Sequence, residues 1–201
     1  MAAQSDLLAR IKACTLCADQ LPLPPKPILQ YSPQSPILIA GQAPGIKAHQ
    51  HGRPFADVSG QRLRQWLGIS EEDFYNPALV SILPMGFCYP GRGKSGDLPP
   101  LPQCAQTWRD ALMAGFTELK LTLVIGQYAQ RYHLPGMTAR SVTETVQQWR
   151  AFSPAIFPLP HPSPRNQGWL ARNPWFAEEL LPALQQRVGE VLGAAKFAQK
   201  T

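Results

Sequence analysis

The sequence has 201 residues, enough for one domain with a substantial core and too few for two full domains. Lysine and arginine number 19 against 13 acidic residues, which gives a formal charge of +6. This charge favours an anionic partner such as nucleic acid; the alternative is a basic protein whose charge only keeps it soluble. The N-terminal segment lacks the pattern of a secretory signal and no run of eighteen apolar residues occurs, so we expect a cytoplasmic protein whose cysteines are ligands or buried thiols.

The first half of the chain predicts two helices and two strands. A short amphipathic helix over residues 5–13 precedes a Cys-x-x-Cys turn, and a proline-rich connector follows over 21–36. The pattern then predicts a strand at 36–40, a glycine-punctuated polar loop at 41–55, a helix at 59–68 and a strand at 78–83.

The second half continues the alternation. A long loop at 84–103 carries no periodicity and is of a length typical of functional loops. After it we predict helices at 104–119, 128–132, 142–150 and 174–192, strands at 121–126 and 155–159, and a frayed tail at 193–201. The whole chain is predicted to be a single domain, with an N-terminal helix and connector (1–35) leading into a core (36–192).

Strands that alternate with helices predict an α/β domain with a four-stranded parallel sheet covered on both faces. Each strand is followed by a conspicuous segment, in chain order GQAPG with GRPF, PMGFCYPG, GQY and HPSPRN. Because the carboxyl ends of parallel strands meet at one edge, we expect these segments to lie together there and to form a binding site.

The four cysteines form a pattern that suits a metal. Two lie in the Cys-x-x-Cys turn and two flank the long loop: Cys14, Cys17, Cys88 and Cys104. Two such pairs can complete a four-thiolate site that joins the N-terminal helix and the loop to the body of the domain. Thiolate ligation alone does not separate zinc from an iron–sulfur cluster, and two buried thiols with an incidental Cys-x-x-Cys remain the alternative.

Together these motifs resemble the uracil-DNA glycosylase superfamily, and most of all its iron–sulfur (family 4) members. The resemblance is carried by GQAPG, GRPF and HPSP in this order and by the cysteine spacing, with seventy residues between the second and third cysteine and fifteen between the third and fourth. It implies a three-layer α/β/α sandwich, a [4Fe-4S] cluster, with zinc as the alternative, and hydrolysis of the bond between an abnormal base and its deoxyribose. Such enzymes extrude the base from the duplex into a pocket.

The resemblance also implies roles for individual residues. Phe55 matches the ring on which the extruded base stacks, and His161 matches the histidine that hydrogen-bonds the base oxygen where charge develops; the alternatives are a core phenylalanine and a structural histidine. The loop of Gln42, Ala43 and Gly45 matches the backbone that lines the pocket and positions water. The segment after the last strand would contact DNA through Ser163, Arg165 and Asn166.

Two departures from the family pattern bear on the chemistry. No carboxylate occurs between Gly41 and Phe55, where relatives carry acidic residues, so we hypothesise that His49 or His51 positions the water. Pro84 stands where relatives read uracil with an asparagine, and it brings neither a side-chain amide nor a backbone donor. A damaged base other than uracil is therefore a further expectation.

The sequence thus predicts a DNA glycosylase of base-excision repair that acts on uracil or another damaged base. A catalytically weak or silent DNA-binding protein of the same fold is the second hypothesis, and an enzyme acting on free nucleosides is the third. We expect a monomer that associates with the nucleoid when it binds DNA. Phosphate contacts are predicted for Lys47, Arg92, Lys94, Arg140 and Arg172.

Overall fold

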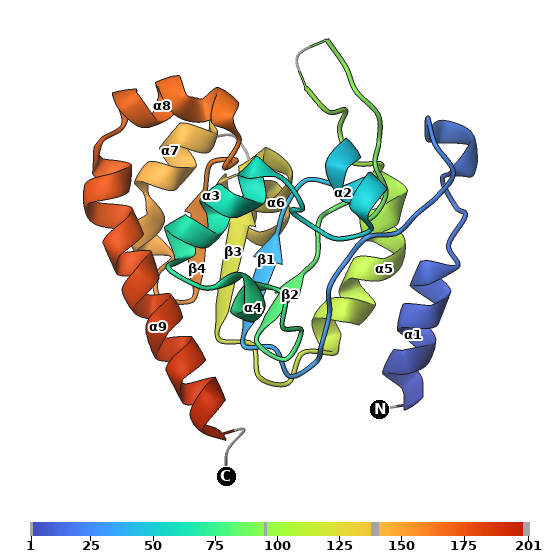
Figure 1. The fold of residues 1–201 in the computed structure, drawn as a ribbon, viewed down its shortest axis with the longest axis horizontal. Coiled ribbons are helices and arrows are strands. Elements are labelled where there is room, and N and C mark those ends of the chain that lie inside the picture. Colours follow the sequence, from blue (N-terminus) through green and yellow to red (C-terminus); the bar gives the residue numbers. More distant parts are fainter. Residues whose placement is uncertain (1, 95, 138–140, 199–201) are drawn as a thin grey trace.

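The computed structural model describes residues 2–94, 96–137 and 141–198, which fold as a sheet between two layers of helices (Figure 1). The strands are β1 (Ile37–Ala40), β2 (Val80–Ile82), β3 (Leu121–Ile125) and β4 (Ile156–Leu159). The helices are α1 (Ala2–Lys12), α2 (Ile46–His51), α3 (Val58–Leu67), α4 (Glu71–Phe74), α5 (Pro102–Ala114), α6 (Gly126–His133), α7 (Val142–Gln147), α8 (Gln167–Arg172) and α9 (Leu181–Ala198). A π-helical turn, Phe176–Leu180, leads directly into α9.

The four strands are all parallel and run in the order β2-β1-β3-β4, which confirms the predicted fold class. Ile37 of β1 lies opposite Val80 on one side and Leu121 on the other. Pro158 occurs in β4, where the missing N–H is tolerated because β4 is an edge strand. At the other edge the connector pairs with β2, because the backbone N–H of Gln30 donates to the Ile82 carbonyl at 3.0 Å and the reverse bond is 2.7 Å.

Side chains alternate between the two faces of the sheet. Ile37 and Ile39 of β1 face a core built with α3, α4, α7 and α9, whereas Leu38 between them faces α1 and α5. Ala40 packs with Ala129 of α6 on that second side. All strand residues except Ile156 are buried, as the near-continuous apolar runs predicted.

The helix boundaries needed correction. Residues 46–51, predicted as loop, form α2, and α8 was not predicted. Helix α3 begins at Val58 and not at Ser59, because the Asp57 side chain accepts the N–H of Gly60 at 3.1 Å and caps the helix. The tail predicted to fray from residue 193 is helical as far as Ala198, and residues 199–201 lie outside the described part of the chain.

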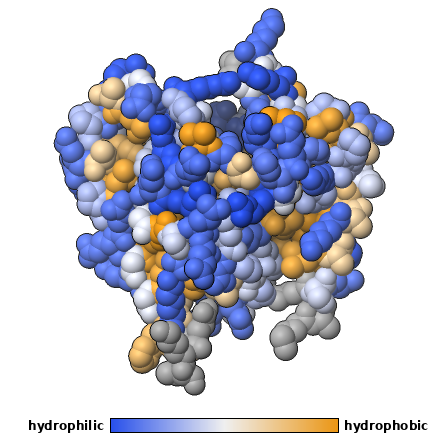
Figure 2. Space-filling view, in the orientation of Figure 1, coloured by the Kyte–Doolittle hydropathy of each residue, from blue (hydrophilic) through white to orange (hydrophobic). Residues whose placement is uncertain are grey.

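All four strands point their carboxyl ends toward α2 and the loop that stands out at the top of Figure 1. That loop joins β2 to α5 (residues 83–101, hereafter the β2–α5 loop), and its outermost part is hydrophilic (Figure 2). The start of α1 and the end of α9 lie at the opposite end of the molecule. Among the described helices, none has the length and apolar character needed to cross a bilayer.

Candidate active site

A pocket opens at the carboxyl edge of the sheet, and we call it the sheet-edge pocket. Its walls are the 41–45 loop after β1, residues 54–57 before α3, Pro84 after β2, and two side chains from farther along the chain, Asp97 and His161. Three of the four segments that were predicted to meet at this edge, those after β1, β2 and β4, line one cavity, whereas GQY after β3 is not part of its described lining. Their separation in sequence is bridged because each follows the end of a parallel strand.

The 41–45 loop is held by the start of the β2–α5 loop. The backbone N–H groups of Met85 and Gly86 donate to the carbonyls of Gly41 and Gln42, at 2.9 and 3.0 Å. The side-chain amide of Gln42 donates to the carbonyl of Leu98 at 2.9 Å. Gln42 therefore lies in the pocket wall and also ties the β2–α5 loop to it.

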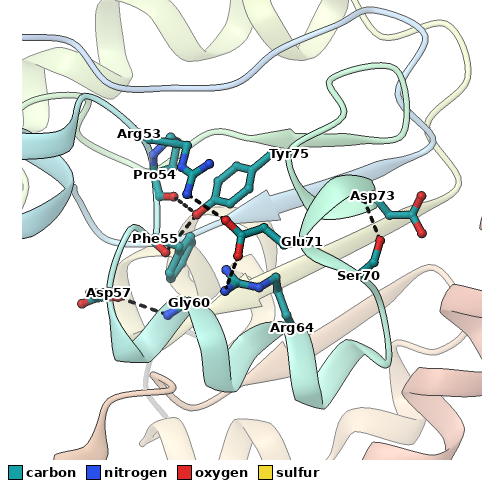
Figure 3. A network of polar contacts seen from close by, with 10 residues as sticks. All are labelled: Arg53, Pro54, Phe55, Asp57, Gly60, Arg64, Ser70, Glu71, Asp73 and Tyr75. Atoms are coloured by element: carbon teal, nitrogen blue, oxygen red, sulfur yellow. Dashed lines mark hydrogen bonds and ion pairs between the residues drawn. The ribbon is translucent and has the colours of Figure 1, made fainter.

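Phe55 enters the pocket from a turn with an unusual backbone. Its φ of 52° is positive, which is uncommon for an aromatic residue and costs about 1–3 kcal/mol. The Tyr75 hydroxyl donates to the carbonyls of Pro54 and Phe55, at 2.9 and 3.0 Å (Figure 3). A Cβ at position 60 would lie 1.9 Å from the Phe55 carbonyl oxygen, so only glycine permits this close approach.

Ion pairs surround the same turn. The Arg53 guanidinium lies over the Tyr75 ring, 3.9 Å from its centroid, and its Nη2 contacts Glu71 at 2.9 Å. The other carboxylate oxygen of Glu71 accepts from Arg64 of α3 at 3.1 Å (Figure 3). The Phe55 ring meets Phe74 edge-on with centroids 6.2 Å apart. The turn that presents Phe55 is thus supported on several sides.

His161 has a defined tautomer. The backbone N–H of Ser163 donates to its Nδ1 at 3.2 Å, so the proton of the neutral ring lies on Nε2. Burial of the ring against the pocket wall lowers the pKa of His161, although part of the residue stays exposed to solvent, and the carboxylates of Asp57 and Asp97 oppose the shift. The neutral ring at pH 7 has one N–H to offer a ligand.

The turn that follows His161 is anchored to α3. Arg62 donates from Nη1 to the Ser163 carbonyl at 3.0 Å, a contact between residues 101 positions apart that no local pattern signals. The Asn166 side chain donates to the His161 carbonyl at 2.6 Å, and the Ser163 hydroxyl accepts the N–H of Arg165 at 3.2 Å. Ser163 and Asn166, predicted to contact DNA, thus also shape this turn, and Arg165 is exposed beside them.

Two carboxylates in the sheet-edge pocket were not predicted. Asp57 caps α3, and Asp97 comes from the β2–α5 loop. Asp97 lies against Gly45, because a Cβ added there would be 3.3 Å from its Oδ2. The family pattern points to a carboxylate only between Gly41 and Phe55, and the loop that holds Asp97 has no periodicity from which its position could be inferred.

The four cysteines line a second cavity, the cysteine cavity, formed by the end of α1, the connector, the β2–α5 loop and α5. The N–H of Phe87 lies 3.3 Å from the Cys104 sulfur and donates to it, and a backbone N–H of Lys26 faces Cys88. Burial raises the pKa of Cys104 to about 12, so its ionisation would require a nearby cation such as a metal. Within the described residues, no three or more His, Cys, Asp or Glu side chains are arranged to hold a single metal ion.

The model of the uracil DNA glycosylase superfamily matches residues 29–185, more than three quarters of the chain. The chain belongs to this superfamily. A solved structure also resembles it, the solution NMR structure of a protein from Methanosarcina acetivorans described as a candidate uracil DNA glycosylase, with 14% identity and a TM-score of 0.48 over 79% of this chain and 94% of that one. That likeness is distant, and the assignment rests on the family match.

Within the superfamily, this member places six predicted residues in one pocket, Gln42, Ala43, Gly45, Phe55, Pro84 and His161, and leaves the two histidines of α2 outside it. His49 and His51 are not among the described residues that line the sheet-edge pocket. The His49 ring lies 6.3 Å from that of Tyr89, and His51 lines a neighbouring cavity with Arg53. Their role as water-positioning bases stays a hypothesis that this placement does not favour.

Behind Pro84 lies a buried cation that sequence analysis missed. Arg109 of α5 is 1% exposed, and its Nη1 donates to the carbonyls of Leu83 and Pro84 at 3.0 and 3.2 Å. Its Nη2 lies 2.7 Å from His133 Nε2. Arg109 therefore engages both carbonyl groups, and Pro84 gives the wall no polar side chain.

Proposed function

We propose that this superfamily member hydrolyses the N-glycosidic bond of uracil or another damaged base in DNA. The observation that carries the proposal is the meeting of the 41–45 loop, Phe55 and His161 in a single pocket at the sheet edge. An extruded base requires a pocket that is open to solvent and that contains an aromatic ring and a hydrogen-bond donor. The net charge of +6 suits a polyanionic substrate.

In the proposed reaction the base lies against Phe55 and its oxygen faces His161. When the bond between the base and C1′ breaks, its electron pair stays on the base, and the Nε2–H of His161 donates to the oxygen that gains charge. A neutral histidine serves this purpose because it donates without needing to lose a proton. Its Nδ1 is already engaged by the N–H of Ser163, so the orientation of the ring is prepared before the base arrives.

The proposed substrate base is not restricted to uracil. Pro84 offers no amide where relatives have an asparagine, and Arg109 holds the Pro84 carbonyl. Position 84 therefore supplies no side-chain hydrogen bond that would favour uracil over a deaminated purine such as hypoxanthine or xanthine.

We further infer that the protein is of the iron–sulfur type, with Cys14, Cys17, Cys88 and Cys104 as ligands. Four thiols around one cavity and N–H donors facing two of the sulfurs support this, as such donors accompany thiolate clusters. The iron–sulfur cluster would have a structural role, linking the N-terminal helix and the β2–α5 loop to the rest of the domain. The proposed reaction needs no redox step. Zinc is the alternative metal. A cytoplasmic location and a monomeric state remain predictions.

A second candidate function is DNA binding without catalysis. It is favoured by one specific observation, the absence of acidic residues from Gly41 to Phe55, where relatives carry them. Such a protein would keep the sheet-edge pocket and would recognise an extruded base without breaking its bond.

An oligonucleotide panel separates the two functions. The purified protein is incubated with single- and double-stranded DNA that carries one uracil, hypoxanthine or xanthine, and alkali then cleaves any abasic site. We expect strand breaks at one or more lesions and a loss of about 100-fold or more in rate for His161→Ala. Binding to lesion DNA without breaks, by gel shift, would support the silent protein and contradict the enzyme. Cleavage of free nucleosides with no salt-sensitive DNA binding would contradict both.

A further inference from the structure

We propose that Asp97, carried by the β2–α5 loop, is the catalytic carboxylate of the sheet-edge pocket. The inference rests on the proposed glycosylase function and goes beyond it, because it assigns the activation of water to a residue outside the superfamily motifs of this chain. Asp97 lines the pocket together with His161 and Phe55. It thereby compensates for the missing carboxylate between Gly41 and Phe55.

The position of Asp97 in the pocket is held by the surrounding backbone. On the two sides of this loop, the N–H of Gly93 donates to the Gly96 carbonyl at 2.7 Å and that of Leu98 to the Gly91 carbonyl at 2.9 Å. The Gln42 side chain bonds the Leu98 carbonyl, one residue after Asp97. The loop is thus fixed to the 41–45 loop at the point where the carboxylate enters.

The Asp97 carboxylate is available for chemistry. No hydrogen bond or ion pair to a described residue occupies it, whereas Asp57, the other carboxylate in the pocket, accepts the Gly60 N–H as the cap of α3. The lack of a side chain at Gly45 leaves Oδ2 its place beside the loop backbone. Of the two carboxylates, Asp97 therefore has the freedom to bind a water molecule.

The hydrolytic step balances with these groups. The bond between C1′ and the base nitrogen breaks with both electrons going to the base, and the sugar becomes positively charged in character. The Asp97 carboxylate stabilises that charge and accepts one proton from water as the water oxygen bonds to C1′. The His161 N–H stabilises the base anion, which takes up a proton from solvent on release.

The charges around Asp97 suit this role. Burial raises the pKa of its carboxyl group, while His161, Arg165 and Arg92 act in the opposite direction and Asp57 adds to the rise. A carboxylate with a raised pKa is a better proton acceptor. The rate should therefore fall on acidification as Asp97 takes up a proton.

The test compares three variants that each remove one carboxylate charge. Asp97→Asn should lower the single-turnover rate at the preferred lesion by about 100-fold or more and abolish the acidic fall of the pH–rate profile. Its affinity for lesion DNA should be unchanged or higher, because a negative charge facing the polyanion is gone. Asp57→Asn, which retains an α3 cap, should lose less than tenfold. The control is Glu118→Gln, an exposed residue at the opposite edge of the sheet, whose rate should match the wild type.

The outcomes distinguish the two levels of the proposal. A wild-type protein that cleaves no lesion overturns the proposed function and this inference with it. A wild-type protein that cleaves while Asp97→Asn keeps its rate within threefold, or while Asp57→Asn loses as much, overturns the inference alone. Circular dichroism and thermal unfolding of each variant show whether a loss of rate reflects a loss of fold.

Discussion

The sheet-edge pocket draws its side chains from distant parts of the chain. Phe55 and His161 follow strands in recognisable motifs, so topology alone brings them to the same edge. Asp97 is brought to the pocket by a loop without periodicity, and Arg109 contacts parts of the chain that are distant in sequence. Arg109 occupies a helical position where a core residue is expected, and nothing in its local sequence reveals that two carbonyls and His133 surround it.

At this scale we predict that Tyr75→Phe weakens both stability and activity. The variant loses the hydroxyl that donates to the Pro54 and Phe55 carbonyls, which should lower the free energy of unfolding by about 1–2 kcal/mol. The Phe55 ring is then held less firmly, so kcat/KM for lesion DNA should fall. Urea unfolding and cleavage kinetics measure the two effects.

The matched control is Tyr132→Phe. This exposed tyrosine donates to Asp110 at 2.7 Å, and an exposed hydrogen bond contributes little because water replaces it. If Tyr75→Phe and Tyr132→Phe behave alike in both measurements, the hydrogen bonds of Tyr75 do not hold Phe55 in place, and the prediction is contradicted.

Among the elements, strands were predicted more accurately than helices. All four strands consist of short apolar runs that lie between helical layers, and this pattern has few alternatives. Helices α2 and α8 are six residues long, and neither has a side-chain cap bond that the sequence could signal. The start of α3 was displaced because Asp57 and Ser59 are both good cap residues, and only the geometry of the turn at Phe55 selects Asp57.

At the scale of the elements, the prediction concerns the β2–α5 loop. Cys88 and Cys104 lie on either side of the segment that carries Asp97, so loss of the metal group proposed for them should loosen that segment. Replacing any one of the four cysteines by alanine should remove iron and sulfide together and increase hydrogen exchange over residues 89–94 and 96–98. Metal analysis, visible absorption and exchange mass spectrometry provide the measurements.

The control for the cysteine variants is Thr15→Ala, which changes an exposed residue inside the same Cys-x-x-Cys turn and leaves the sulfurs intact. It should keep its metal. A wild-type protein that is colourless and contains zinc would contradict the iron–sulfur assignment, and a cysteine variant that keeps full metal content would remove that cysteine from the ligand set.

For the molecule as a whole, the pairing of Arg109 with His133 makes stability depend on pH. Burial, with Arg109 as a second cause, lowers the pKa of His133 to about 3 in the folded protein, against 6.5 for the free side chain. Between these values the unfolded chain binds a proton that the folded protein does not. The free energy of unfolding must therefore fall as the pH is lowered through this window.

We predict that His133→Gln reduces this dependence. Glutamine can accept from Arg109 and does not titrate, so between pH 6.5 and 4 the variant should lose less stability than the wild type, by on the order of 1 kcal/mol per pH unit. Urea unfolding at several pH values measures the difference, and carboxylates that titrate in both proteins cancel from it. His51→Gln, a change to an exposed histidine, should follow the wild-type curve, and a His133→Gln curve that also follows it would contradict the prediction.

The start of α1 and the end of α9 both lie at the end of the molecule remote from the protruding β2–α5 loop (Figure 1). An affinity handle or a fluorophore attached beyond α9 would therefore project away from the mouth at which DNA arrives. Protein immobilised by that handle on a sensor chip presents its reactive side to the flowing solution, so binding and turnover can be recorded on the same tethered molecules.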